Sequence, residues 1–408
     1  MILVSHPTGN TFVRALLAQL EAHNLLGTFY TTLALHPDDR AVQMLPAKAR
    51  AQALRRAYDV PAAKLQRFPL REAARHGLPK LGLRRLTRHE RGPASLDAVY
   101  HDLDRRVAAQ LAGQKANGVT GVYCYEDGAL RTFEAARKFG LRCFYELPIA
   151  YWETGARLLS EEARRYPDWE PTLVGTRDSP AKLRRKTREL ELADVVIVPS
   201  QFVLDSLPDW ARQNKECVIA PFGSPDVGGS EVAESQSNDA RPLRVLFAGS
   251  MTQRKGLADL FAAAKLLGRS DVELVVLGSP VAPMEFYRAQ GVPFRYEAPR
   301  PHAQVLELMR SCDILALPSI VEGRALVQQE AMACGLPLLV TPNAGGQDLI
   351  DEGETGWLVP IRSPEALAQK LAYLADNRAL LPSMRRNARA KAAQYTWECY
   401  GQTIVEAL

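Results

Sequence analysis

Short apolar runs separated by amphipathic stretches recur along this chain of 408 residues in two successive series. Such alternation is typical of parallel, doubly wound sheets, in which buried strands and covering helices take turns along the sequence. The first series has strand candidates at 2–5, 28–33, 121–125, 142–146, 195–198 and 217–220. The second has them at 244–248, 272–277, 294–296, 314–317, 336–340 and 357–359. We therefore expect an α/β protein with two Rossmann-like domains.

A polar stretch rich in glycine and serine, residues 226–239, lies between the two series. It follows Pro221-Phe222-Gly223-Ser224-Pro225, so the domains are expected to join near residues 221–242. The last amphipathic stretches, 363–377 and 380–408, run beyond the second series. Trp397 in the final one needs an apolar partner, and the first domain is a candidate.

The composition, 47% hydrophobic and 24% charged, is that of a soluble globular enzyme. No apolar run approaches the ~18 residues of a membrane span, and the first residues lack the features of a signal peptide. The cysteines form no CxxC pair and no cluster with histidines, so we expect reduced thiols in a cytoplasmic protein and no metal site. They are Cys124, Cys143, Cys217, Cys312, Cys334 and Cys399.

One segment carries all the excess positive charge. Between Lys48 and Arg91, thirteen lysines and arginines face three acidic residues, whereas the whole chain has a net charge of +5. Leucines and one phenylalanine are interleaved with these bases: Leu54, Leu65, Phe68, Leu70, Leu78, Leu81, Leu83 and Leu86. The pattern suits an anionic membrane surface or a phosphate-bearing acceptor, and it equally suits a solvated, arginine-rich helical face. No nucleic-acid-binding module accompanies it, so no nucleic-acid partner is expected.

Two glutamates, Glu322 and Glu330, flank the start of a predicted helix in the second domain. The residues that follow, Ala331-Met332-Ala333-Cys334-Gly335-Leu336-Pro337, place a left-handed glycine cap and then a proline at its end. A helix N-terminus offers unpaired N–H groups and a partial positive charge, so it suits a phosphate or a developing oxyanion. The alternative is that Glu322 caps the helix and Glu330 is an ordinary exposed carboxylate.

The strand at 244–248 is followed by Gly249-Ser250-Met251-Thr252-Gln253-Arg254-Lys255-Gly256-Leu257 and an apolar-periodic helix. A strand, a glycine loop with two cations and a helix form a plausible diphosphate site, although Arg254-Lys255 could also be a solvated helix start. The loops Gly278-Ser279-Pro280 and Pro299-Arg300-Pro301-His302 follow neighbouring strands. Because ligands in open parallel sheets lie beyond the carboxyl ends of the strands, these loops would complete the rim, with a nucleobase against their backbone.

Together these motifs resemble the retaining glycosyltransferases of family 4, which have the GT-B fold. The motifs are the run from Glu322 to Pro337, Arg254-Lys255-Gly256, Gly345-Gly346 and Gly353-Glu354-Thr355-Gly356-Trp357-Leu358-Val359-Pro360. The likeness covers essentially all of residues 190–408, whereas 1–185 match only loosely, at His6-Pro7-Thr8-Gly9-Asn10. By this resemblance residues 1–222 form an acceptor-binding domain, to which about 388–408 cross back. Residues 223–387 form the donor-binding domain.

The resemblance implies roles on the donor side. Glu330 would hydrogen-bond the ribose of a nucleotide sugar, most simply a UDP-sugar, and Glu322 would lie by the sugar ring. Arg254 and Lys255 would neutralise the leaving diphosphate. The other donor-binding candidates are Gly249, Ser250, Gly278, Ser279, Arg300, Gly323, Arg324, Ala325 and Leu326. Fixed cations and a helix N-terminus stabilise a leaving diphosphate by themselves, and no strand-end Asp-x-Asp is present, so we expect neither metal nor cofactor.

The resemblance further implies same-face attack with retention of configuration, in which the leaving phosphate accepts the acceptor's proton. The acceptor is expected to be a glycan, a lipid-linked molecule or a small molecule in polysaccharide biosynthesis. Its candidate contacts are His6, Gly9 and Asn10 after the first strand, and Glu126 and Asp127 after the strand at 121–125. His6 could instead be structural. The protein is expected in the cytoplasm, with the inner face of the cell membrane as a candidate docking surface.

Two other functions fit the same motifs. A GT-B epimerase or hydrolase would bind the same donor and use water or no acceptor, and a non-catalytic homologue would bind the nucleotide sugar without reacting. The chain also departs from the family pattern at two places. Ser250 stands where many members have arginine, and Arg324-Ala325 replaces Phe-Gly beside the sugar.

Overall fold

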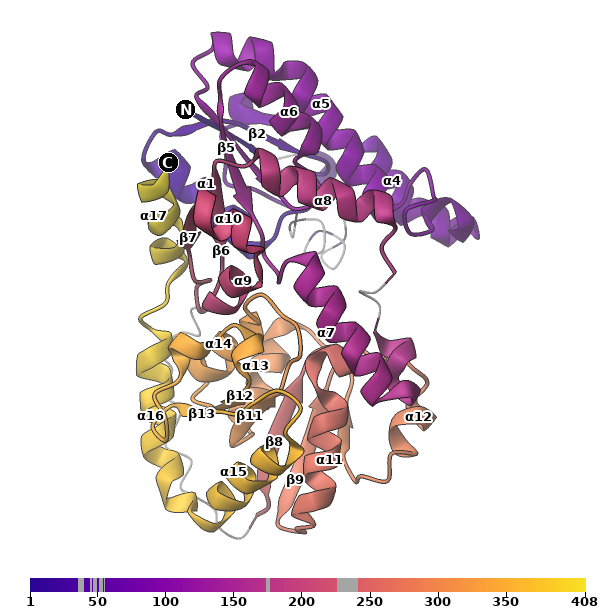
Figure 1. Cartoon of the computed structure of the whole chain (residues 1–408), viewed down its shortest axis with the longest axis vertical. Helices are drawn as coiled ribbons and strands as arrows, with labels where there is room; N and C mark the ends of the chain where they lie inside the picture. Colours follow the sequence, from indigo (N-terminus) through magenta and orange to yellow (C-terminus); the bar gives the residue numbers. More distant parts are fainter. Residues whose placement is uncertain are drawn as a thin grey trace.

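The computed structural model describes residues 1–35, 40–44, 46, 50, 54, 56–173, 177–225 and 241–408. Its described part forms two α/β domains, stacked one above the other in Figure 1. The polar linker 226–239 and part of the basic segment, residues 48, 49, 51–53 and 55, lie outside the described residues. All strand pairs within the two sheets are parallel, as the alternating pattern predicts.

The upper domain contains a sheet of strand order β3-β2-β1-β4-β5-β6-β7 among the described residues. Its strands are β1 (Ile2–Ser5), β2 (Leu26–Thr31), β3 (Leu65–Arg67), β4 (Gly121–Tyr125), β5 (Arg142–Glu146), β6 (Val195–Val198) and β7 (Glu216–Ile219). Its helices are α1 (Thr11–Ala22), α2 (Arg40–Gln43), α4 (Leu70–Gly77), α5 (Leu96–Ala116), α6 (Leu130–Lys138), α7 (Trp152–Arg165), α8 (Pro180–Leu192), α9 (Gln201–Ser206) and α10 (Asp209–Asn214). Its short 3₁₀ helices are η1 (Ala62–Lys64), η2 (Leu78–Leu81), η3 (Arg84–Thr87) and η4 (Pro167–Thr172).

The lower domain contains a sheet of order β10-β9-β8-β11-β12-β13. Its strands are β8 (Leu243–Ala248), β9 (Val272–Leu277), β10 (Arg295–Glu297), β11 (Ile314–Leu317), β12 (Leu338–Val340) and β13 (Gly356–Leu358). Its helices are α11 (Leu257–Leu267), α12 (Met284–Arg288), α13 (His302–Arg310), α14 (Leu326–Ala333), α15 (Pro364–Asp376) and α16 (Leu381–Ala392). The 3₁₀ turns are η6 (Gln253–Lys255), η7 (Pro342–Ala344), η8 (Gln347–Leu349) and η9 (Arg378–Leu380).

Every predicted strand is present, with bounds within two residues of the expected ones, because fully buried parallel strands are nearly continuous apolar runs. Only β3 was not predicted from the sequence. Its three residues, Leu65-Gln66-Arg67, are half-buried or exposed at the sheet edge, so they carry no apolar run.

The last helix, α17 (Trp397–Ala407), leaves the lower domain and packs on α1 of the upper one. Figure 1 shows it as the yellow helix that ends near the N-terminus. Trp397 packs against Phe222, with ring centroids 6.0 Å apart, which confirms an apolar partner for it at the first domain. Ala388 and Ala392 still belong to the lower core, so the crossing begins after residue 392, slightly later than the expected 388.

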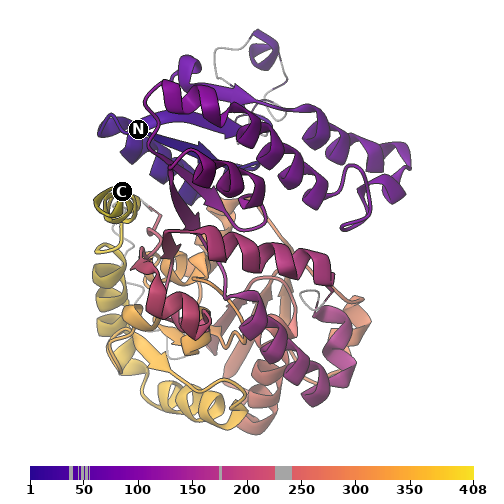
Figure 2. The same ribbon diagram turned by 45° about the horizontal axis from the view of Figure 1, so that its top comes forward.

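The segment from α7 to η4 also reaches across the boundary. Helix α7 begins in the upper domain and runs down beside α11 and α12 (Figures 1 and 2). Trp169 in η4 is buried in the lower core, where its ring lies 5.0 Å from Phe286 and 6.0 Å from Phe261. The domains therefore exchange two segments, α7–η4 in one direction and α17 in the other, which ties them together at both sides.

Candidate active site

The predicted phosphate loop and the predicted helix N-terminus meet at Glu322. Its Oε1 atom lies 2.5 Å from Nη1 of Arg254 and 2.5 Å from Nζ of Lys255. Arg254 also donates to the carbonyl of Val321 at 3.1 Å, and its own carbonyl accepts the N–H of Ile320 at 2.9 Å. Burial lowers the pKa of Lys255, and the carboxylate of Glu322 opposes that shift. The structure thus places all three predicted catalytic residues in one ion cluster.

A glycine fixes the turn that delivers this cation pair. Gly256 has φ 75°, and a β-carbon there would lie 1.9 Å from the carbonyl oxygen of Pro318. Only glycine adopts this backbone and this approach without strain. The loop after β8 is thereby pressed against the loop after β11, which is why Arg254 and Lys255 reach Glu322.

The glycines after β8 and β9 also lie side by side. A β-carbon on Gly278 would lie 1.7 Å from the carbonyl oxygen of Gly249, and the N–H of Met251 donates to the carbonyl of Ser279 at 3.0 Å. This close approach brings the predicted donor residues Gly249, Ser250, Gly278 and Ser279 together at the carboxyl edge of the sheet.

Helix α14 starts at Leu326, ends at Ala333 and is followed by Gly335 with φ 85°, as the sequence indicates. Glu330 lies one turn into it, partly exposed, and its Oε1 atom is 3.1 Å from Nε2 of His302 at the start of α13. Arg300, two residues before His302, instead pairs with Glu297. Its role in donor binding stays a prediction.

Arg324 points away from the ion cluster. Its buried guanidinium donates to Oδ1 of Asp348 at 2.7 Å, to the carbonyl of Gly345 at 3.2 Å and to Gln329 at 3.1 Å. It also lies 5.0 Å from the ring centroid of Tyr395. These contacts connect the start of α14 to η8 and to the segment that crosses to the upper domain. The side chain of Arg324 therefore has a structural role, and its contact with the donor stays a prediction. The N–H of Ala325 likewise already donates to the carbonyl of Ala344.

The loop that leads into α14 is held against the upper domain. Ser200 donates a 2.6 Å hydrogen bond to the carbonyl of Gly323, and a β-carbon on Gly323 would lie 1.7 Å from the carbonyl oxygen of Pro148. Both upper-domain partners follow strands, Pro148 after β5 and Ser200 after β6. The carboxyl edges of the two sheets therefore meet at Gly323.

The ion cluster is braced by a buried interdomain network. Gln253, which precedes Arg254, donates to Glu162 on α7 at 2.6 Å and to Asp259 at 2.9 Å. Arg165, also on α7, lies 2.6 Å from Asp259. This network could not be predicted from the sequence, because Glu162 and Arg165 lie on a helix that precedes the linker and was assigned to the other domain. Helix α7 thus positions the phosphate loop.

The upper domain contains a cavity of about 170 Å³ at the carboxyl edge of its sheet. Four of the five predicted acceptor residues, His6, Asn10, Glu126 and Asp127, line it. The remaining lining residues are Phe12, Leu96, Asp97, Tyr100, Tyr125, Pro148 and Lys182. Gly9 is not among the lining residues. A β-carbon on it would lie 2.2 Å from the hydroxyl of Tyr58, so it permits close packing of the loop.

His6 is buried, and its edge packs on Tyr125 with ring centroids 4.6 Å apart. Its Nδ1 atom accepts the N–H of Thr8 at 3.1 Å, which assigns the ring proton to Nε2. Burial lowers the pKa of His6 to about 3. The imidazole is therefore neutral at physiological pH and offers an N–H donor rather than a base.

A buried carboxylate shapes the loop that carries Glu126 and Asp127. Glu189 on α8 accepts the N–H groups of Asp127, Ala129 and Leu130 at 2.8–3.0 Å. This capping holds Asp127 at φ 68° and starts α6. Burial raises the pKa of Glu126 to about 7, against the opposing effect of Lys186.

Lys182 and Lys186, together with Asp97 and Tyr100, were missed in the sequence analysis. The two lysines lie at i and i+4 on α8, where Ser179 caps the helix before Pro180. That spacing puts both ammonium groups on one helix face, which is the signal that could have pointed to them. Asp97 and Tyr100 lie on α5 at i and i+3, which likewise puts them on one helix face.

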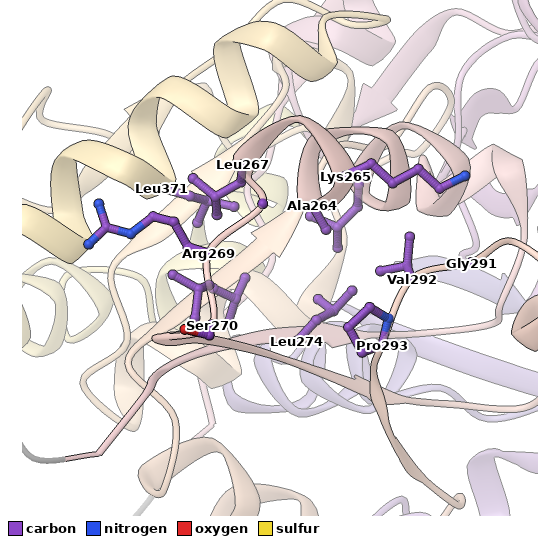
Figure 3. Close-up of a pocket in the computed structure, with 14 residues that line it drawn as sticks. Ala264, Lys265, Leu267, Arg269, Ser270, Leu274, Gly291, Val292, Pro293 and Leu371 are labelled. Atoms are coloured by element: carbon purple, nitrogen blue, oxygen red, sulfur yellow. The ribbon is translucent and has the colours of Figure 1, made fainter.

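A larger cavity of about 460 Å³ lies at the opposite edge of the lower sheet. Figure 3 shows Ala264, Lys265 and Leu267 on α11, with Leu274, Val292 and Pro293 across from them. Val272, the first residue of β9, also lines it, so the cavity is at the amino ends of the strands. Active sites of open parallel sheets lie at the other edge, so this cavity is not part of the predicted donor site.

In the part of the chain that the structure describes, one group of three side chains has the spacing of metal ligands: His89, Glu90 and Asp178. The group lies in the upper domain, and Asp178 is already 3.3 Å from Lys182. No described helix has both the length and the apolar character needed to cross a bilayer.

Comparison with known proteins agrees with this architecture. Residues 230–391 match the family model of glycosyl transferases group 1. A D-inositol 3-phosphate glycosyltransferase of Jonesia denitrificans is 28% identical over 71% of this chain and 77% of its own length. A protein of the same name from Corynebacterium efficiens is 32% identical, over 54% of this chain and 58% of the relative.

Solved structures match the whole chain. HepE of Anabaena in complex with UDP has a TM-score of 0.61 at 18% identity, covering 100% of this chain and 98% of its own. Sucrose-phosphate synthase of Thermosynechococcus elongatus has a TM-score of 0.63 at 20% identity, covering 100% and 97%. The chain has the GT-B fold, and its lower domain is similar to the group 1 glycosyltransferases.

Proposed function

We propose that this protein transfers a sugar from a nucleotide-sugar donor, bound at the lower sheet, to an acceptor bound in the upper-domain cavity. The contact at Pro148 carries this proposal. Pro148 lines the cavity, and its carbonyl oxygen packs on Gly323 at the start of the donor helix. An acceptor hydroxyl that projects from the cavity at this point would therefore lie next to the donor sugar.

The charges at Glu322 suit a leaving diphosphate. Arg254 and Lys255 are held together by one carboxylate, so both are already oriented before a donor binds. A diphosphate would share these cations, and preorganised cations stabilise the charge that develops on it. Glu330, one turn into α14, would accept the ribose hydroxyls. We propose a UDP-sugar donor, because HepE, which shares this fold, is described in complexes with UDP and with UDP-glucose.

We propose that transfer proceeds with retention and without a metal ion, as in family 4. The neutral His6 supports same-face attack, because an imidazole that donates through Nε2 orients an acceptor hydroxyl and does not remove its proton. The proton would then pass to the leaving phosphate. The acceptor oxygen forms a bond to the anomeric carbon of the sugar while the bond from that carbon to the diphosphate breaks.

Melting temperatures measured with UDP-, GDP- and ADP-sugars test the donor site first. The UDP-sugar is expected to raise the melting temperature most, because the rise grows with a ligand's affinity for the native state. Nuclear magnetic resonance of the product then reports its anomeric configuration, and EDTA should leave turnover unchanged. Nucleotide release without any acceptor, at the full rate, favours an epimerase or hydrolase. Binding without turnover on any acceptor favours a non-catalytic homologue, and inverted product contradicts the mechanism.

We also propose that the protein docks on an anionic membrane through part of its basic segment. The chain from α4 to η3 lies at the outer end of the upper domain (Figure 1) and exposes large apolar side chains. Leu70 is 79% exposed and Leu81 is 74% exposed. We call the following residues the leucine–arginine surface: Leu70, Leu81, Leu83, Leu86, Lys80, Arg84, Arg85 and Arg88, all of them exposed.

The cations of this surface are available to a partner. Within the described residues, no carboxylate lies within 4.0 Å of Arg84, Arg85 or Arg88, although most other arginines of the domain are paired. Exposed leucines among unpaired cations suit the interface of an anionic bilayer. The carbonyl of Leu86 accepts the N–H of Ala94, two residues before Leu96 of the cavity. Docking would therefore bring the acceptor cavity near the inner face of the cell membrane.

A further inference from the structure

The upper-domain cavity is surrounded by more carboxylates than cations. Nζ of Lys182, which lines it, lies 2.9 Å from Asp97, 3.5 Å from Asp127 and 3.3 Å from Asp178. Nζ of Lys186 lies 3.4 Å from Glu126, 3.8 Å from Asp127 and 3.6 Å from Asp178. Each ammonium group is thus already shared among three carboxylates.

These two lysines and four carboxylates form a cluster with a formal charge of −2 when Glu126 is ionised. The next cation, Arg185, does not change this balance, because it pairs with Asp104 at 2.5 Å and with Glu189 at 3.0 Å. His89 is likewise placed between carboxylates, 3.2 Å from Asp178 and 3.4 Å from Asp97. No spare cation therefore faces the cavity from the described residues that pack around it.

The polar groups of the cavity are suited to hydroxyls. His6 presents an N–H at Nε2, and Asn10 and Tyr100 add an amide and a phenol. Oδ1 of Asp127 is buried, and no donor of the described chain hydrogen-bonds to it. Hydroxyl groups both donate and accept, so they match such a mixed lining, and the rings of Phe12 and Tyr125 offer apolar surface to a sugar's C–H groups.

We infer that the acceptor group bound in this cavity is an uncharged polyol, such as one sugar residue with free hydroxyls, and that phosphorylated acceptors are excluded. The inference rests on the proposed function, in which this cavity is the acceptor site. A phosphate would enter a negatively charged cluster without a free partner, and such repulsion is an effective way to reject a ligand. The volume of about 170 Å³ fits a small unit better than a drug-sized molecule.

Saturation-transfer NMR on the purified protein with UDP tests the inference. The probes are glucose, mannose and myo-inositol, each compared with its monophosphate. With wild-type protein, the saturation-transfer signal of each uncharged compound is expected to be at least about tenfold stronger than that of its phosphate, because like charges repel at the site. The double substitution Asp97→Asn and Asp178→Asn removes the excess negative charge and is expected to reduce this preference several-fold.

Asp178→Asn alone leaves the Asp97 contacts in place, and it should reduce the preference less, in the same direction. The matched control, Asp209→Asn with Glu216→Gln, makes the same change in net charge at exposed residues of the same domain and should leave the preference unchanged. Equal or stronger saturation of the phosphates, saturation of neither class, or a preference that the Asp178 variants do not move would overturn the inference. A UDP-induced rise in melting temperature in the same samples shows whether the donor site, and with it the proposed function, still stands.

Discussion

The carbonyl oxygen of Pro148 in the upper domain lies so close to the α-carbon of Gly323 in the lower one that a β-carbon there would be 1.7 Å away. Gly323→Ala must therefore push the two sheets apart at the point where we propose that donor and acceptor meet. Because small misplacements of reacting groups are costly, we expect kcat/KM to fall by about 10²-fold. Steady-state kinetics with both substrates measures this fall.

Nucleotide binding separates displacement from unfolding in that variant. The melting-temperature shift with UDP should persist, because the ion cluster and α14 lie wholly in the lower domain. Gly113→Ala is the control, since Gly113 is inside α5 with open space around its α-carbon, and alanine there should stabilise the helix by about 1 kcal/mol. Unchanged kinetics in Gly323→Ala would mean that the observed domain contact is not the reactive arrangement.

Loss of either cation at Glu322 should slow the chemical step. Lys255→Met and Arg254→Met each remove a charge that the leaving diphosphate would use, and we expect kcat to fall by about 10²-fold, or roughly 2.7 kcal/mol. Arg269→Met is the control, because Arg269 is paired with Asp271 and Asp376 outside the site. A loss below about 1 kcal/mol in kcat/KM for both variants would exclude leaving-group stabilisation by this pair.

Glu330→Ala should weaken nucleotide binding specifically. Among the described residues, only His302 lies within ion-pair distance of Glu330, which is partly exposed, so the substitution leaves no buried charge behind. We expect a loss of at least about tenfold in UDP affinity by calorimetry, consistent with a hydrogen bond to a charged group. Glu307→Ala, on the exposed face of neighbouring α13, should not alter affinity. Equal affinities of wild type and Glu330→Ala would remove the ribose role.

The donor site was the part of the molecule most accessible to sequence reasoning. Its residues lie in short, contiguous runs after strands, and local rules predict features of them, such as the left-handed cap at Gly335 and the helix N-terminus between Glu322 and Glu330. Even so, residue type alone did not give the partner of each cation. Arg324 lies two residues from Glu322, yet its side chain turns to Asp348, because the pairing of a buried guanidinium depends on tertiary neighbours.

Only part of the proposed acceptor cavity could be predicted from the sequence. His6, Asn10, Glu126 and Asp127 could be predicted, because they directly follow strands whose carboxyl ends share an edge. Lys182 and Asp97 come from helices that are distant in sequence, and nothing local specifies which helix face meets the loops. For the same reason the brace between Gln253 and Glu162 could not be predicted, since it depends on α7 crossing to the other domain.

The stability of the protein should fall as the pH rises from about 5 to 7 through the contribution of Glu146. Burial raises the pKa of Glu146 from its usual 4.5 to about 7, although Tyr123 and Tyr400 donate hydrogen bonds to it. Between these values the folded state holds a proton that the unfolded state has lost, so stability is lost as the pH rises, by up to about 3 kcal/mol.

Urea unfolding at pH 5, 6, 7 and 8 measures this slope. Glu146→Gln cannot ionise and should make the slope shallower, whereas Glu134→Gln, at a half-exposed position on α6, should keep it. Because Tyr400 lies on α17, the loss is expected to appear first as increased hydrogen exchange in that helix. A wild-type stability that is constant or rises across this range would contradict the assignment.

Membrane docking through the leucine–arginine surface should depend on both its charge and its leucines. Sedimentation with vesicles of phosphatidylglycerol and phosphatidylcholine is expected to retain the protein at low salt and to release it as salt screens the cations. The triple substitution of Arg84, Arg85 and Arg88 by glutamine should abolish binding, and Leu70→Ser with Leu81→Ser should weaken it at constant charge.

Two control variants test whether these effects belong to the surface. The charge control replaces Arg105, Arg188 and Arg212 by glutamine; these are exposed arginines elsewhere on the same domain. The apolar control is Leu266→Ser on the lower domain. Neither control should alter binding, because both leave the surface intact. If the control variants lose vesicle binding equally, the loss reflects net charge or stability and not this surface. Vesicle binding that does not change with salt would show that the surface does not act through anionic lipid.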